Sequence, residues 1–287
     1  MTARVSFPDR AKRTGAAVAW IASFGVAGGA SGWAVSRIGP EPGPAWSLAW
    51  SSLSGAVGFA LATWLVGRVL DRRSWAYLGW RPRTRVPAAL LAGVLLGAVM
   101  AAGAAGLAVL VGGATITNTG DWAGWGRATL PLGTGFLLAA ITEELAFRGY
   151  PLRRLADALG AGPATSLGAI GFGLAHLGNP SATAFSTVNV ALAGVWLACA
   201  FFSPGAMPLA WGAHFGWNAT LALGFEAPVS GYVFPQPAIA YRAGAHGWID
   251  GGAFGPEGGI VTTLVMLVGT VALVAWSRTF RKAEPTA

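Results

Sequence analysis

Long apolar runs, separated by short polar or basic stretches, occupy most of this 287-residue chain. Because the hydrocarbon core of a bilayer is about 30 Å thick, a helix that crosses it needs roughly 20 apolar residues. Eight segments follow this pattern, and the fifth, sixth and seventh are the shortest. They cover residues 16–36, 46–70, 87–112, 129–147, 161–178, 186–203, 205–223 and 259–278. The pattern predicts an all-α fold, a polytopic transmembrane helix bundle with about eight transmembrane helices.

The polar interruptions divide the chain into four regions. We expect an N-terminal three-helix transmembrane region over residues 1–128, a helical core over 129–223, an external loop over 224–258, and a final helix with a basic cytoplasmic tail over 259–287. The loop is rich in glycine, proline and aromatic residues and too interrupted to span a membrane. Loops of this length are uncommon unless they are functional or disordered. Because its aromatic content favours packing, we expect it to cover the bundle as a lid or cap.

Composition indicates an integral membrane protein, since 54% of the residues are hydrophobic and only 10% are charged. Ordinary globular domains carry about 25% charged residues. The formal charge of +8 does not indicate a nucleic-acid partner, because the basic residues flank apolar segments instead of gathering on one soluble domain. The positive-inside rule predicts that both termini are cytoplasmic, since all 19 basic residues except Arg37, Arg127 and Arg242 then face the cytoplasm. The composition is typical of a bacterial protein, so we expect the chain to lie in the bacterial cell membrane, with lipid around the helix bundle.

Two adjacent carboxylates and an arginine stand at the end of the fourth apolar run, in the stretch TEELAFRGY. Ionised side chains at the centre of a bilayer cost from about 2.5 kcal/mol upward, so they are rare there and indicate function by default. Residues four apart share one face of a helix, so Glu144 can pair with Arg148, while Glu143 points about 100° away. An ion pair at the end of a helix would be the simpler explanation of this pair taken alone.

Two further polar pairs have the same spacing of four residues. Phe172 precedes His176 in GFGLAHLGNP, and His214 precedes Asn218 in WGAHFGWNAT. Taken alone, a histidine such as His176 on an apolar helix is more often a hydrogen-bonded core residue than a catalytic one. A hydrogen bond between helices explains His214 and Asn218 at least as well as function does. Together with the carboxylates, however, they form a catalytic set, because a glutamate in an apolar pocket can deprotonate a water molecule. Aligned donors on one helix face can also stabilise an oxyanion. The combination predicts hydrolysis.

The motifs EELAFR, FGLAH and HFGWN, in this order and spacing, resemble the EExxxR, FxxxH and HxxxN motifs of the CPBP family. This family comprises the CAAX-prenyl-protease-like and the bacteriocin-processing, Abi-like intramembrane proteases. FRGYPLRRL and the stretch up to HFGWN also resemble the continuous core of that family, so the resemblance covers roughly residues 130–222. It implies an intramembrane endopeptidase whose catalytic core lies within residues 129–223. The implied substrate is a membrane-associated peptide or protein, either prenylated or secreted.

The resemblance also implies roles for single residues. Glu143 would be the base that activates the hydrolytic water, and His176 would help to hold that water. Glu144 and Arg148 would orient the site. Phe172 would pack beside the site as the aromatic residue of the family. The implied donors to the oxyanion of the tetrahedral intermediate are His214 and Asn218.

A zinc-dependent mechanism is the alternative, with Glu143, His176 and His214 as ligands, because two histidines and a glutamate form a known catalytic zinc set. The sequence contains no HExxH motif, and its single cysteine, Cys199, excludes a cysteine-based zinc site. Glu143 does not easily serve as both metal ligand and base. We therefore expect no cofactor and favour a glutamate-type mechanism.

Two other functions use the same residues. In a proton-coupled transporter, the carboxylates and histidines would form a relay, although the chain has no visible inverted repeat. In a non-catalytic scaffold or immunity protein, the loop over 224–258 would bind a partner.

If the three motifs form one site, their residues must lie at the same depth in the membrane. At about 1.5 Å per residue, Glu143 lies roughly 21 Å from the outer start of its helix and His214 roughly 13 Å from the inner start of its own. These depths agree, whereas His176 would lie only a few ångström from the outer surface. Either the fifth helix begins below the membrane plane and tilts, or the stretch after it re-enters the bundle as a protein-buried loop.

Overall fold

The computed structural model describes residues 7–39, 42–80, 85–235 and 238–283. Among the basic residues that carry the predicted orientation, Arg4, Arg81 and Arg83 lie outside these ranges. Helices dominate the described residues, and the only strands among them are β1 (Thr115–Asn118) and β2 (Ile239–Arg242), which pair antiparallel with Thr115 opposite Arg242. The prediction of an all-α, polytopic helix bundle is therefore confirmed.

All eight apolar segments form helices. These are α1 (Phe7–Ser36), α2 (Ser47–Ala62) with a π-helical extension (Thr63–Leu70), α3 (Val86–Gly112), α4 (Trp122–Glu144) with a π-helical extension (Leu145–Gly149), α6 (Ala161–Ala175), α7 (Ala184–Phe202), α8 (Ala206–Ala219) with a π-helical extension (Thr220–Gly224), and α10 (Ile260–Ala283). Two more helices, α5 (Tyr150–Leu159) and α9 (Gly247–Asp250), and three 3-10 turns, Pro44–Trp46, Gly252–Phe254 and Pro256–Gly258, complete the described elements.

Six helical stretches of the described chain are long and apolar enough to cross a membrane, whereas α6 and α8 are shorter. Exposed apolar side chains such as Val26 on α1, Leu110 on α3 and Val268 on α10 cover the outer helices. Such surfaces are stable against lipid but not in water. The protein is an integral membrane protein. Helix α8 does not face lipid in the same way, because most of its side chains are buried against neighbouring helices.

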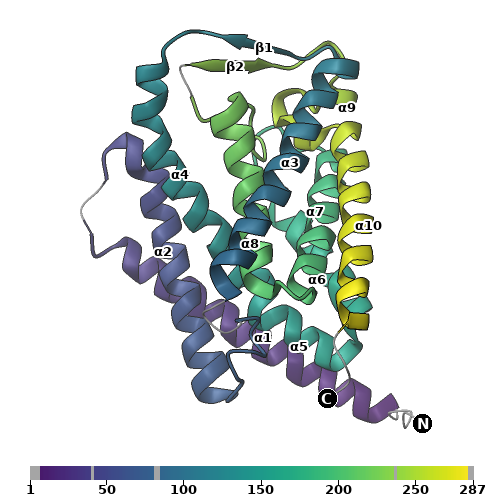
Figure 1. The fold of residues 1–287 in the computed structure, drawn as a ribbon. Coiled ribbons are helices and arrows are strands. Elements are labelled where there is room, and N and C mark those ends of the chain that lie inside the picture. Colours follow the sequence, from purple (N-terminus) through teal and green to yellow (C-terminus); the bar gives the residue numbers. More distant parts are fainter. Residues whose placement is uncertain (1–6, 40–41, 81–84, 236–237, 284–287) are drawn as a thin grey trace.

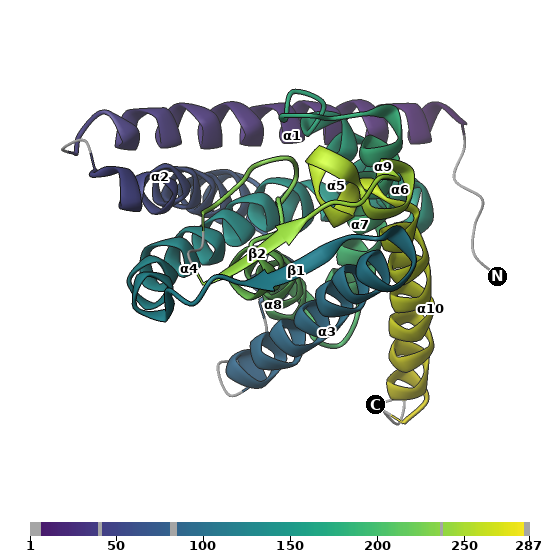
Figure 2. The same cartoon turned by 90° about the horizontal axis from the view of Figure 1, so that it is seen from above.

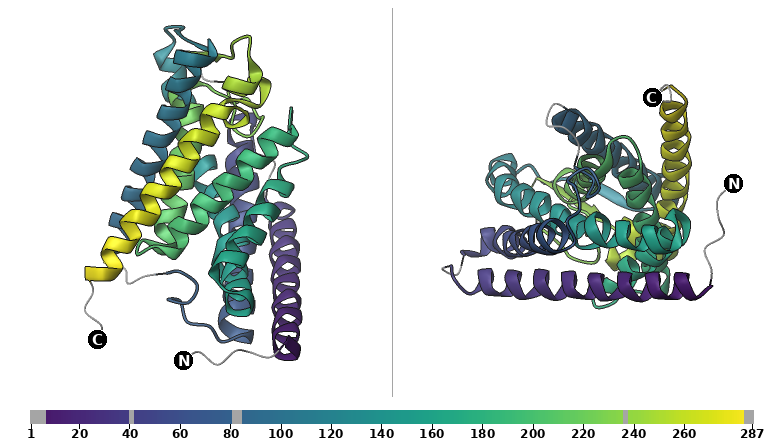
Figure 3. Two further views of the ribbon diagram at one scale, coloured as in Figure 1. Left: turned by 90° about the vertical axis from the view of Figure 1, so that its right-hand side faces the viewer. Right: turned by 90° about the horizontal axis from the view of Figure 1, so that it is seen from below.

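The two ends of the described chain lie at the same end of the bundle. Figure 1 shows the start of α1, the helix α5 and the end of α10 at the lower end, and the β-ribbon with α9 at the upper end. Seen from above, the ribbon lies across the top of the bundle (Figure 2). Helix α1 runs along one flank of the molecule and α10 lies on another (Figure 3). The arrangement is compatible with both termini on one side of the membrane.

The segment over 224–258 is folded instead of being a plain loop. Its strand β2 pairs with β1, and the buried carboxylate of Asp250 accepts hydrogen bonds from the backbone N–H groups of Gly244 and Gly252. From α7, Asn189 donates to the backbone oxygens of Glu257 and Gly259, each at 2.9 Å. We call residues 224–258 the cap, because they cover the upper end of the bundle.

Helices α3 and α8 approach each other through glycines. A Cβ atom on Gly97 would lie 2.0 Å from the carbonyl oxygen of Ala213, and one on Gly212 would lie 2.2 Å from that of Leu90. A further glycine on each helix, four residues away, makes the same kind of contact. Small residues at this spacing let membrane helices pack closely. The contact fixes the position of α8, the helix that carries His214.

Substitution of Gly97 by alanine should separate α3 from α8, because the nearest atoms are backbone and cannot move aside. We expect Gly97→Ala to lower the free energy of unfolding by about 1–3 kcal/mol, the usual cost of overpacking. The matched control is Gly106→Ala on the same helix, where a Cβ would meet nothing within 4 Å. The control should be neutral or up to about 1 kcal/mol more stable, because alanine favours helix. Thermal unfolding midpoints in mild detergent measure both, and equal midpoints would contradict the close contact.

Candidate active site

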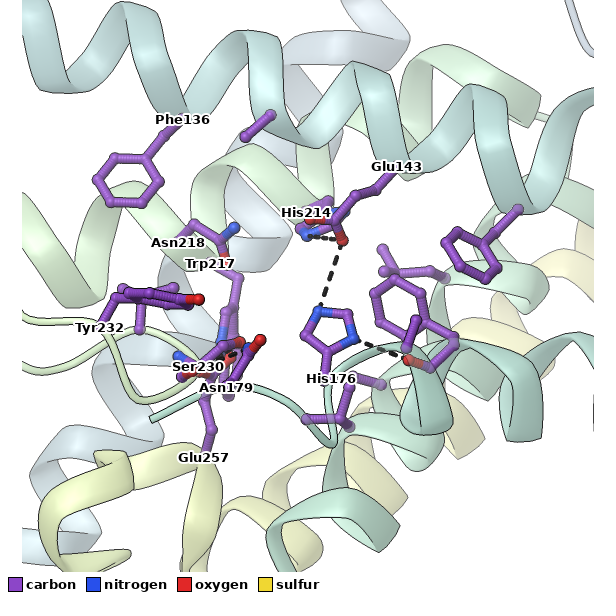
Figure 4. Close-up of a pocket in the computed structure, with 18 of the residues that line it drawn as sticks. Phe136, Glu143, His176, Asn179, His214, Trp217, Asn218, Ser230, Tyr232 and Glu257 are labelled. Atoms are coloured by element: carbon purple, nitrogen blue, oxygen red, sulfur yellow. Dashed lines mark hydrogen bonds and ion pairs between the residues drawn. The ribbon is translucent and has the colours of Figure 1, made fainter. Parts of the chain in front are cut away.

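A cavity of about 360 Å³ lies beneath the cap, between α4, α7, α8 and the end of α6. Four of the six predicted site residues line it (Figure 4): Glu143, His176, His214 and Asn218. The other two, Glu144 and Arg148, lie behind it, with side chains only 0% and 3% exposed. The structure thus brings the three motifs together at one place.

Glu144 is the carboxylate that connects α4 to α8. Its Oε1 accepts a hydrogen bond from Arg148 Nη1 at 3.1 Å and one from His214 Nδ1 at 2.8 Å. The predicted pair four residues apart therefore forms, and it gains a histidine as third member. Since a carboxylate only accepts hydrogen bonds, Nδ1 of His214 carries a proton. The other ring nitrogen, Nε2, lies 3.7 Å from Oε2 of Glu143.

The ring of His176 is also oriented by a hydrogen bond at Nδ1, in this case within its own helix. Its Nδ1 lies 2.7 Å from the backbone oxygen of Phe172, so this nitrogen donates and Nε2 is directed away from the helix. That Nε2 lies 3.8 Å from Oε2 of Glu143. The Phe172 ring packs against the imidazole, with centroids 4.7 Å apart, and the Arg148 guanidinium lies over the ring at 4.0 Å. Phe172 is the predicted aromatic neighbour of the site.

The carboxylate of Glu143 is therefore faced by two imidazoles. Both Nε2 atoms are too far from it for a direct hydrogen bond, and Oε2 is buried without a hydrogen-bond partner among the described residues. Polar atoms at such separations are commonly bridged by a water molecule. The side chain of Glu143 is 33% exposed, more than that of Glu144. Glu143 is therefore the available carboxylate and Glu144 the oriented one, as the helix spacing predicted.

Zinc fits these donors less well. With bonds of 2.0–2.1 Å, two ligand atoms of a tetrahedral zinc lie about 3.3 Å apart. The separations of 3.7 and 3.8 Å between Glu143 and the two imidazoles are wider. Within the described residues, no group of three or more histidine, cysteine, aspartate or glutamate side chains has the arrangement of a metal site.

The depth of His176 agrees with that of Glu143 because α6 is short. Its 15 residues rise about 22 Å, less than the bilayer core, and His176 caps its C-terminus. The short helix and the turn that follows it both bear on the two alternatives considered from the sequence, because Asn179 of this turn lines the cavity. Two residues further on, Ser181 is exposed. Asn179 donates to the backbone oxygen of Ser230 at 3.0 Å and so attaches this turn to the cap.

A second acidic residue of the cavity wall was not identified from the sequence. Glu257, in the cap, accepts hydrogen bonds from Trp217 Nε1 at 2.8 Å and from the backbone N–H and the hydroxyl of Ser230. Burial raises the pKa of the Glu257 carboxyl. It lies opposite the catalytic candidates in the same cavity (Figure 4). The only signal in the sequence is a lone acidic residue in the glycine-rich stretch GPEGG.

Comparison with known proteins agrees with the motifs. Residues 125–220 match the family model described as Rce1-like, type II CAAX prenyl endopeptidase. The matched region extends from the first turn of α4 to the end of α8 and contains all six predicted site residues. No curated protein and no solved structure matches the chain.

Loss of either partner in the Glu144–Arg148 pair should destabilise the fold, because the remaining buried charge loses its ion-pair partner. We expect Glu144→Ala and Arg148→Ala each to cost about 3–5 kcal/mol. The double variant should cost much less than the sum, since neither charge then remains. Unfolding midpoints of the four proteins in detergent measure this cycle. Additive losses would show that the two side chains are not coupled.

Proposed function

We propose that the chain is a glutamate-dependent intramembrane endopeptidase, and the match of residues 125–220 to the Rce1-like family model of type II CAAX prenyl endopeptidases supports this proposal. The observation that carries the proposal is the approach of two imidazole Nε2 atoms to one oxygen of Glu143, at 3.7 and 3.8 Å. The cavity beside these atoms has space for a water molecule, whose proton the Glu143 carboxylate can accept. The family match favours hydrolysis over a proton relay or a scaffold.

In the proposed reaction, a water molecule lies between Glu143 and His176. Glu143 removes one proton from it as the hydroxide attacks the carbonyl carbon of the scissile peptide bond. The carbonyl oxygen becomes an oxyanion, which accepts hydrogen bonds from the Asn218 amide and from Nε2 of His214. Glu143 then gives the proton to the leaving nitrogen as the C–N bond breaks. The products are a carboxylic acid and an amine, and Glu143 returns to its ionised state.

His214 can donate through Nε2 only when its ring carries two protons, because Nδ1 already donates to Glu144. The surrounding charges support this state. Glu143 and Glu144 bring two negative charges and Arg148 one positive charge, so an imidazolium at His214 makes the buried group neutral. Buried charges are stable when they are paired and hydrogen-bonded. Glu144 would thus supply the oxyanion site with its charge as well as its orientation.

Apolar side chains form the remaining wall of the cavity, among them Phe136, Trp196, Leu197 and Met266. Such a wall lowers the local dielectric and strengthens the interactions of the polar groups. It also suits an apolar peptide segment or a lipid-modified one. We therefore propose a membrane-associated peptide or protein as substrate, prenylated or secreted. The enzyme would act in a bacterial cell membrane with both termini in the cytoplasm.

Replacement of Glu143 should abolish peptide cleavage without unfolding the protein. A positioned general base contributes about 10²- to 10⁴-fold to the rate, so Glu143→Gln and His176→Ala should each lose activity within this range. The control is His246→Ala, because His246 lies in the cap, is exposed and does not line the cavity. Mass spectrometry of reconstituted protein with prenylated and unprenylated CAAX peptides measures cleavage. Activity retained in Glu143→Gln, with a normal unfolding midpoint, would refute the assignment.

Removal of metal ions should leave cleavage unchanged if the base acts on water directly. We expect full activity of the purified protein after treatment with 1,10-phenanthroline and exchange into metal-free buffer. The metal content of the same sample, measured by mass spectrometry, should be far below one ion per chain. Loss of activity that zinc restores would instead assign Glu143, His176 and His214 as ligands.

A further inference from the structure

A second cavity, of about 230 Å³, lies at the lower end of the bundle and is lined by three arginines from separate elements. Arg13 belongs to α1, Arg73 to the segment between α2 and α3, and Arg154 to α5. Ala16 and Ala17 of α1 also line the cavity, and their small side chains leave the space between the three arginines open. None of its lining residues lines the cavity that holds Glu143, so the two sites are separate.

The guanidinium groups outnumber the carboxylates beside them. Oδ2 of Asp71 lies 3.0 Å from Arg73 Nε and 3.6 Å from Arg154 Nε, and Oδ2 of Asp157 lies 3.7 Å from Arg73 Nη2. Two carboxylates thus face three guanidinium groups. Arg13, which is exposed at the cavity, brings the surplus positive charge. The cavity has the charge of an anion-binding site.

Arg154 provides the second indication of a ligand. Its Nε is buried and donates no hydrogen bond within the part of the chain that the structure describes. A buried N–H group costs free energy until an acceptor reaches it. A phosphate group has several strong acceptor oxygens, and the planar fork of arginine matches its geometry.

The surroundings of the cavity indicate that lipid presents this phosphate. The exposed ring of Trp75 lies nearby in sequence, with the Arg68 guanidinium 5.4 Å from its centroid, and tryptophans are enriched at membrane–water interfaces. Above Arg13, α1 exposes apolar side chains such as Val18, against which acyl chains can lie. We propose that this cavity binds the phosphate of an anionic phospholipid headgroup.

The test uses the full-length protein in uncharged detergent, titrated with dioleoylphosphatidylglycerol, dioleoylphosphatidylcholine or inorganic phosphate. A ligand that binds the folded state raises the unfolding midpoint. We expect phosphatidylglycerol to raise it most. Arg13→Gln should weaken this lipid about fivefold, the contribution of one basic residue towards anionic lipid. Lys12→Gln, which removes an exposed charge outside the cavity, should have a much smaller effect.

A second pair of variants changes the shape of the cavity without changing charge. Ala16→Phe should fill the cavity and remove the stabilisation by phosphatidylglycerol, while leaving the midpoint without lipid unchanged. Ala19→Phe, at an exposed position of α1 that does not line the cavity, should retain it. Equal effects of Arg13→Gln and Lys12→Gln, or equal binding of both lipids, would overturn the site. Stabilisation by inorganic phosphate equal to that by lipid would overturn the lipid as its source.

Discussion

The buried carboxylate of Glu144 is the group on which the site depends. An isolated carboxylate would be very costly in this environment, and it is stabilised here by Arg148 at 3.1 Å and His214 at 2.8 Å. Because it accepts from Nδ1, it fixes the orientation of the imidazole and directs Nε2 to the cavity. The next residue back along α4, Glu143, then faces the cavity from another side of the helix. The ion pair of Glu144 with Arg148 therefore fixes the positions of Glu144, Glu143 and His214.

Helix α8 is the second element that must be held in place, because it carries both proposed oxyanion donors. Its glycine contacts with α3 bring the two backbones together, as at Gly97. From the opposite side, the cap residue Glu257 accepts a hydrogen bond from Trp217, the neighbour of Asn218. Glu144 holds one turn of α8 and Glu257 the next. Since Glu257 lies outside the matched family region, the cap completes a site that the family motifs describe only in part.

The sequence predicted what local periodicity determines. The helices, the pairing of Glu144 with Arg148 and the separate direction of Glu143 follow from apolar runs and from a repeat of 3.6 residues per turn. The association of the three motifs came from a family resemblance. Hydropathy extended the fifth helix to residue 178, and this obscured the depth of His176, because α6 ends at Ala175. The cap was least predictable, since Glu257 contacts residues 27 and 40 positions away, and no local pattern encodes such contacts.

A double-mutant cycle in kcat between Glu144→Gln and His214→Gln shows whether the buried carboxylate acts through the imidazole. If Glu144 acts through the imidazole, removal of His214 takes away what Glu144 contributes, and the double variant is no slower than the slower single variant. We expect this non-additive result, with unfolding midpoints showing that all four proteins are folded. Rate losses that multiply would contradict it, because the two side chains would then act independently.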